Sequence, residues 1–121
     1  MHVTSGDSAV VVKIRGDADF SSAPSLARKL YPLAGTGRPL VLDLSELGFC
    51  GVAVLEVFFA AGHRAADCGG AMLLAAPARP IRRVLNLADC GGLLPTTRCV
   101  EEALAALAPD CDDARNTTDT G

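Results

Sequence analysis

Three short apolar runs, separated by segments with helical periodicity, constrain the fold of this chain more than any other feature. They read AVVVKIR at residues 9–15, PLVLDL at 39–44 and AMLLA at 71–75. The first run is β-branched and partly alternating, and the other two are continuously apolar, as in strands that are covered on both faces. Strands that alternate with helices pair in parallel through right-handed crossovers. The sequence therefore predicts an α/β fold with a small, mixed and largely parallel β-sheet.

About four helices are expected between and after these strands. The first begins at Ser22, a residue type that caps helices, and has Pro24 in its first turn. The last is amphipathic, and Thr97 is the residue type expected to cap it. The predicted ranges are helices at 22–33, 52–68, 80–87 and 97–108, turns at 16–19 and 45–48, and a short edge strand at 93–95.

The chain has the length of one domain, 121 residues, which we assign to residues 1–108. Residues 109–121 are polar without an apolar period and are predicted to be a disordered tail. No stretch approaches the roughly 20 apolar residues of a transmembrane helix, and residues 1–7 lack an apolar signal core. We therefore expect a cytoplasmic protein without membrane insertion. The net charge of −3 argues against nucleic-acid binding, which requires a basic stripe.

The cysteines do not have the spacing of a metal site. They contain no C-x-x-C pair and no ligand-spaced set with histidine, so we expect neither a metal nor a cofactor. In a reducing compartment such residues are small hydrophobes with free thiols. The five are Cys50, Cys68, Cys90, Cys99 and Cys111.

Four segments resemble the anti-sigma factor antagonists of the STAS family. They read VKIRGDAD at residues 12–19, LVLDLSELGF at 40–49 and GGAMLLAA at 69–76, and the fourth runs from 80 to 107 with RRVLNLADCGGLLP and VEEALAAL. No single motif is highly specific, but their order and spacing are similar to the family pattern over residues 8–108. The resemblance implies a regulator that binds an anti-sigma factor, usually a serine kinase with a histidine-kinase-like fold, and so frees a sigma factor.

The family's phosphoacceptor segment is degenerate in this chain. The resemblance implies an Asp-Ser-Ser/Thr-Gly-like segment at the start of the second long helix, where a helix N-terminus can receive a phosphate. Aligned from Phe49, its four positions fall on Gly51, Val52, Ala53 and Val54, and neither Val52 nor Ala53 has a hydroxyl. We therefore expect residues 50–54 to bind the partner without a phosphorylation switch at this place.

Two interpretations of this loss stay open. In one, the protein is a permanently binding-competent antagonist, or has drifted to another role. In the other, a thiol replaces the hydroxyl, because Cys50 precedes the helix start, where a thiol pKa can be depressed. In the usual STAS arrangement Cys90 lies on the same side of the sheet, so a Cys50–Cys90 disulfide is a hypothesis beside that of two inert thiols. A Cα–Cα distance above about 7 Å would exclude the disulfide without backbone movement.

The helix at 52–68 is apolar nearly all round, which one face of a sheet does not require. Either it is sandwiched between the sheet and another helix, or part of it is exposed for a partner. Asp17, Asp19 and Glu56 are candidate contacts for a basic patch on that partner, although isolated carboxylates are more often simply solvated. The sequence is also compatible with a homodimer.

The sequence admits two other function classes. One is the STAS subunit of a phospholipid-transport ATPase complex, which the same resemblance allows. The other is an enzyme with Cys50 as nucleophile, which would need a general base within reach. The only candidate base is His63, about three helical turns away, so the sequence favours a protein that is not an enzyme.

Overall fold

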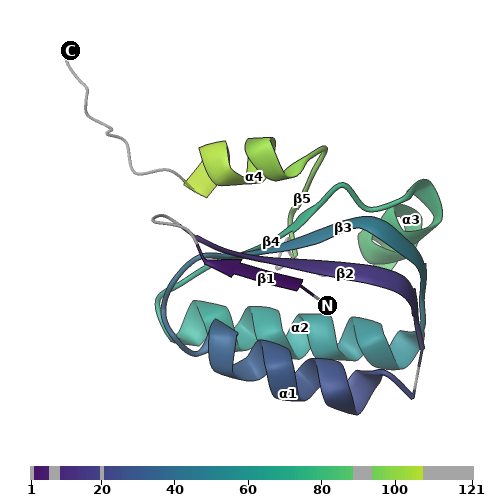
Figure 1. The fold of residues 1–121 in the computed structure, drawn as a ribbon, viewed down its shortest axis with the longest axis horizontal. Coiled ribbons are helices and arrows are strands. Elements are labelled where there is room, and N and C mark those ends of the chain that lie inside the picture. The colour runs from purple at the N-terminus through teal and green to yellow at the C-terminus, as the bar shows by residue number, and fades with distance from the viewer. Residues whose placement is uncertain (1, 6–8, 20, 89–93, 108–121) are drawn as a thin grey trace.

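Five strands form one sheet in the order β1-β2-β3-β4-β5 in the computed structural model, which describes residues 2–5, 9–19, 21–88 and 94–107 (Figure 1). β2, β3, β4 and β5 pair in parallel, and β1 pairs with β2 in the antiparallel sense. The predicted α/β fold with a mixed, largely parallel sheet is therefore confirmed. The strands are β1 (His2–Ser5), β2 (Val10–Ala18), β3 (Leu40–Cys50), β4 (Met72–Ala75) and β5 (Thr96–Thr97).

Four helices cover this sheet, as predicted. α1 and α2 lie side by side on one face, α4 lies on the opposite face, and α3 lies at one end of the sheet (Figure 1). No helix among the described residues is long and apolar enough to cross a membrane. Their bounds are α1 (Ala23–Ala34), α2 (Val52–Asp67), α3 (Arg79–Ala88) and α4 (Val100–Leu107).

β1 was not predicted. Its four residues, HVTS, carry too little apolar pattern to indicate a strand. It forms along the free edge of β2, with Val3 opposite Val12, because that edge presents unpaired backbone N–H and C=O groups.

β2 and β3 both continue through the segments predicted to be turns at 16–19 and 45–48. Register shifts between Lys13 and Arg15 and between Gly16 and Asp17 let β2 stay paired with β3 through its polar end. Gly16 has a φ of +79°, which a glycine adopts without steric cost. Those turn predictions were wrong because the residues that favour a turn are accommodated here by irregular strand pairing.

The core has two layers because successive strand residues point to opposite faces. Leu40, Leu42 and Leu44 of β3 pack in the layer that contains Phe58 of α2. Val41, between them, packs in the second layer, which also contains Ala103 of α4. The continuously apolar runs at 39–44 and 71–75 are thus covered on both faces, as predicted.

The all-round apolar character of α2 has two explanations, and both apply. Most of its body is buried between the sheet and α1, with Phe58 fully enclosed. Its first residue, Val52, is 73% exposed. The first turn is therefore the part of α2 that is left open.

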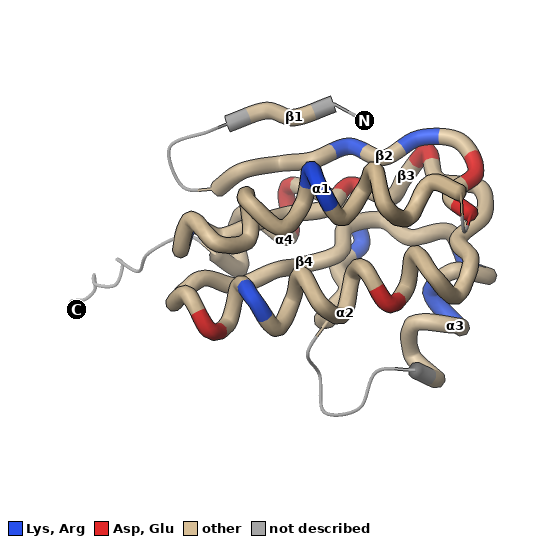
Figure 2. Tube along the Cα trace, turned by 90° about the horizontal axis from the view of Figure 1, so that it is seen from below, with Lys and Arg blue, Asp and Glu red and all other residues tan. Residues whose placement is uncertain are grey.

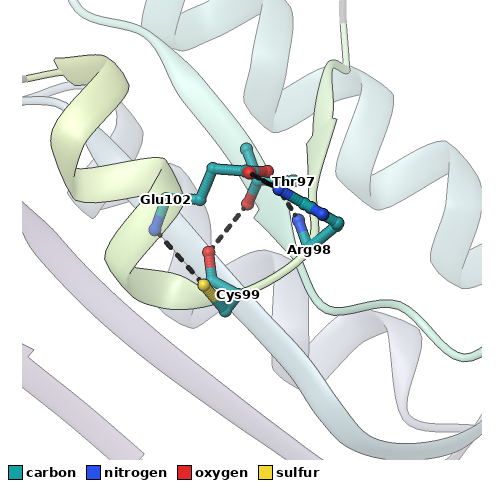
Figure 3. Close-up of polar contacts among 4 residues, drawn as sticks. All are labelled: Thr97, Arg98, Cys99 and Glu102. Carbon is teal, nitrogen blue, oxygen red and sulfur yellow. Dashed lines mark hydrogen bonds and ion pairs between the residues drawn. The ribbon is translucent and has the colours of Figure 1, made fainter.

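α4 begins later than predicted and is not capped by Thr97. Cys99 precedes the helix, and its Sγ accepts a hydrogen bond of 3.4 Å from the backbone N–H of Glu102 (Figure 3). The Glu102 carboxylate in turn accepts the backbone N–H of Arg98 at 2.9 Å. Thr97 instead donates its hydroxyl to the Cys99 carbonyl oxygen at 3.0 Å. The Cys99 contact is one half of a capping box with sulfur in place of the hydroxyl, whereas the Glu102 carboxylate accepts from Arg98, the residue before the cap.

The edge strand expected at 93–95 is found at Thr96–Thr97, where it pairs with the end of β4. Three further predictions fall wholly or partly on residues outside the described ranges. They are the tail at 109–121, the thiol of Cys90 and the start of that edge strand at residue 93.

Candidate functional site

The candidate partner-binding segment lies where β3 passes into α2. β3 ends at Cys50, and Gly51 stands at the N-cap of α2 in an extended conformation. Asp17 of β2 is the register partner of Phe49, and Ala18 is the register partner of Cys50. The parallel pairing therefore brings the acidic end of β2 against the segment that precedes α2.

The degenerate phosphoacceptor positions differ sharply in exposure. Val52 is open to solvent, Ala53 is half-buried and Val54 is fully buried. Gly51 makes no side-chain cap, and the first turn of α2 contains no acidic residue. The helix start thus keeps the free N–H groups that would suit an anion, but its exposed side chain is apolar.

The hydroxyl of Ser21, just before α1, lies near this helix start, which the sequence did not indicate. A Cβ placed on Gly51 would lie 3.6 Å from the Cα of Asp19. Asp19 Oδ1 accepts the Ser21 hydroxyl at 2.6 Å and the Ser21 backbone N–H at 3.0 Å. Ser45, by contrast, precedes Gly51 by six residues of strand, or about 20 Å at 3.3 Å per residue. Only the pairing of β2 with β3 reveals this proximity.

Asp19, rather than Ser22, organises the start of α1. Ser22 makes no side-chain cap hydrogen bond, so the predicted cap was wrong. The Ser21 hydroxyl, followed by the backbone N–H groups of Ser21 and Ser22, lowers the pKa of Asp19. Asp19 is therefore a charged, exposed group beside the start of α2.

The thiol of Cys50 does not have a depressed pKa. It is half-buried, and burial raises its pKa to about 11 because desolvation disfavours the thiolate. Its Sγ lies 3.8 Å from the Gly51 carbonyl oxygen, an acceptor that favours the neutral thiol. The burial of this thiol therefore argues against an activated thiolate at this helix start. The Cys50–Cys90 pair stays a hypothesis, because Cys90 lies outside the described residues.

An apolar groove of about 140 Å³ opens beside this segment. The end of β3 forms one wall and the start of α3 forms the other, with Leu55 of α2 at the base. Phe49 is 52% exposed and Val84 is 43% exposed, so two large apolar side chains border the groove in solvent. The lining residues are Gly48, Phe49, Cys50, Leu55, Pro80, Ile81 and Val84.

The three candidate acidic contacts are all exposed, and two of them adjoin this groove segment. The Asp17 carboxylate lies 3.1 Å from the position of a Cβ on Gly48. Asp19 lies beside Gly51, as described above. Glu56 follows Val52 by four residues on α2, which places the two side chains on the same side of the helix.

A larger, open hollow of about 440 Å³ lies on the α4 face of the sheet. Its polar groups have partners within the protein: Lys13 Nζ is 2.9 Å from a Glu46 carboxylate oxygen, and Asp43 Oδ1 accepts the Ser45 backbone N–H at 3.0 Å. No group of three potential metal ligands occurs in the described ranges. This hollow therefore offers weaker grounds for a functional site than the apolar groove.

His63 lies far along α2 from the groove. Eleven helical residues separate it from Val52, or about 17 Å at 1.5 Å per residue. The structure therefore does not bring His63 to Cys50, as the enzyme alternative would require.

Comparison with known proteins gives a family and a shared fold. A family model described as "Mlab, STAS domain" matches residues 1–95. A comparison with curated proteins found no match.

Three solved structures share most of this architecture. A protein described as an anti-sigma factor antagonist from Thermotoga maritima matches with a TM-score of 0.78 at 17% identity, covering 88% of this chain and 92% of that one. An anti-sigma factor antagonist from Mycobacterium paratuberculosis matches at 0.77 and 26% identity, covering 88% and 91%. Phosphorylated SpoIIAA from Bacillus matches at 0.70 and 15% identity, covering 88% and 98%.

Proposed function

This chain belongs to the STAS family, and from that premise we propose that it is a non-enzymatic, cytoplasmic regulator that binds an anti-sigma factor and so frees a sigma factor. The proposed partner is a serine kinase with a histidine-kinase-like fold. Support comes from the likeness to an anti-sigma factor antagonist at 26% identity over 88% of the chain. The proposed contact surface is the segment 50–54 with the groove beside it.

The observation that carries this proposal is the exposed apolar pair formed by Phe49 and Val52 at the opening of α2. Exposed large apolar side chains beside a groove favour protein docking, because covering them removes apolar surface from water. A hydroxyl is absent at both phosphoacceptor positions. We therefore propose that the protein binds its partner constitutively, without phosphorylation of this segment.

The test is a binding titration of the reduced protein against each anti-sigma serine kinase of its own organism. Val52→Asp places a charge on the proposed surface and should weaken binding at least about tenfold, because a desolvated charge without a partner is costly. Ala60→Asp, an exposed change two turns further along α2, is the matched control and should leave affinity unchanged. If no kinase binds the unaltered protein, the antagonist function is wrong.

The second candidate is the STAS subunit of a phospholipid-transport ATPase complex. The observation that favours it is again the apolar start of α2, since a permanently bound subunit needs no phosphorylation switch. Co-purification of the tagged protein with a transport ATPase and permease, in place of a kinase, would support this role.

A further inference from the structure

The outer face of α3 carries charge that the rest of the described chain does not neutralise. Ile81 and Leu85 are buried against the core, whereas Arg79, Arg82 and Arg83 are exposed. None of the three arginines takes part in an ion pair within the described ranges. Three cations within five residues repel one another, so this helix presents an unsatisfied positive surface.

One of these arginines projects closer to the groove-lining residues of α3 than the other two do. A helix turns about 100° per residue, so Pro80, Val84 and Leu87 project to one side of α3. Pro80 and Val84 line the groove, and Leu87 is 87% exposed. The same geometry places Arg83 about 60° from Pro80, whereas Arg79 is about 100° from Pro80 and Arg82 about 100° from Ile81, the lining residue nearest to each. Arg82 projects about 160° from Pro80, toward the other flank of the helix.

The opposite rim of the groove is acidic. The Asp17 carboxylate lies 3.1 Å from the position of a Cβ on Gly48, which lines the groove. Figure 2 shows acidic positions at the end of β2 and on α2, and basic positions where α3 begins. The groove therefore lies between the Asp17 carboxylate and the basic surface of α3.

We propose that the groove receives an apolar side chain of a protein partner, and that a partner carboxylate flanking that side chain binds Arg83. This inference rests on the proposed function and specifies the chemistry of its partner. Arg83 then helps to select among related kinases. A kinase that binds would have to present an acidic group toward Arg83 and a basic group toward Asp17. Charges at the rim of an interface act mainly on the association rate.

A protein fits this arrangement better than a membrane surface does. Anionic lipid would meet the arginines and the carboxylates together, and the second contact is repulsive. The groove volume of about 140 Å³ suits one or two side chains of a structured segment. A protein can present groups of both charges on the two sides of the groove, whereas a uniformly anionic surface cannot.

The experiment measures association and dissociation rates of the full chain with the anti-sigma kinase that the unaltered protein binds. Arg83→Glu should slow association roughly tenfold, and the difference should shrink at high salt. Arg82→Glu makes the same charge change on the far flank and should stay within about twofold. Circular dichroism and thermal unfolding of both variants confirm that each is folded. Restored binding of the Arg83→Glu variant to a kinase with one carboxylate changed to lysine would support the proposal most directly.

Three results would overturn it. If Arg83→Glu and Arg82→Glu have equal effects, or if neither has an effect, the antagonist function would stand. Arg83 would then not be a residue that binds a partner carboxylate. Failure of the unaltered protein to bind any kinase would remove the proposed function, and this inference with it. Binding to phosphatidylglycerol vesicles that both substitutions abolish would identify α3 as a lipid-binding surface instead.

Discussion

Gly51 donates its backbone N–H to the carbonyl oxygen of Ala18 over 2.9 Å, and this bond ties the start of α2 to the end of β2. The bond joins two segments that are 33 positions apart in the sequence. It therefore holds the first turn of α2 against β2 without a side-chain cap. The backbone of the segment that aligns with the family's phosphoacceptor is thus held in place, although Val52 and Ala53 carry no hydroxyl. A serine introduced into this segment would therefore place its hydroxyl at an ordered helix start.

Val52→Ser should accept phosphate from the anti-sigma kinase that binds the protein. Val52 is mostly exposed, so its replacement should change the free energy of unfolding by no more than about 0.5 kcal/mol. The free N–H groups of the helix start would favour the added negative charge. Intact-mass measurement after incubation with kinase and ATP detects the phosphate.

Val54→Ser is the control for that experiment. Val54 is fully buried, so a hydroxyl there should remain unmodified and cost on the order of 1–3 kcal/mol of stability. Phosphate on the unaltered segment, or on the Val54→Ser variant, would contradict the structure of this site.

Cys50 should react with iodoacetamide much more slowly than Cys68 at pH 8. Burial raises the pKa of Cys50 to about 11, so its thiolate fraction at that pH is only about a thousandth. Cys68 is exposed and serves as the internal reference. Labelling each thiol as a function of pH should show the Cys50 rate still rising above pH 9. A Cys50 rate that levels off near pH 7 would revive the thiolate switch.

Glu46 should stabilise the protein most at low salt and neutral pH. Its carboxylate is 2.9 Å from both Lys13 Nζ and Arg15 Nε, which joins β2 to β3 where their register shifts. The hydrogen bond and charge of Lys13 lower the pKa of Glu46, and Glu46 raises that of Lys13. The Glu46 contribution is therefore present above its ordinary pKa and is lost as pH falls through the lowered one.

The contribution of Lys13 to the stability of the protein has the opposite pH dependence. It is complete below the ordinary lysine pKa and is lost as pH rises through the raised one. Glu46→Gln should consequently lower the urea midpoint slightly between these limits, and the two proteins should converge in acid and in high salt. A difference that persists in strong acid would point to packing rather than to charge.

Cys99→Ala should destabilise α4 by about 0.5–2 kcal/mol, the usual effect of losing an N-cap acceptor. Cys99→Ser should keep or increase stability, because a hydroxyl oxygen is a stronger acceptor than a thiol sulfur. Urea unfolding of the three proteins gives the comparison. Equal midpoints for the alanine and serine variants would show that the Sγ contact does not cap the helix.

Prediction from sequence succeeded where the signal was local. The apolar runs at 39–44 and 71–75 gave the central strands, and the helix at 52–68 was placed to within one residue of α2. It failed where distant pairing decided the outcome. β1 and the extensions of β2 and β3 exist because neighbouring strands satisfy their backbone groups, which no short window of sequence reveals.

The sequence by itself determined the chemistry available at the start of α2. Val52 and Ala53 have no hydroxyl in any fold, so the loss of the phosphoacceptor follows from residue identity alone. The likeness to STAS proteins also required only the order and spacing of its segments.

Only the tertiary structure decided what surrounds that helix start. The pKa of Cys50 is raised rather than depressed because packed neighbours exclude water from its thiol. Phe49 and Val84 border one groove because the fold brings together segments 35 residues apart. Burial and surface shape depend on such distant neighbours, and the local pattern of a chain does not specify them.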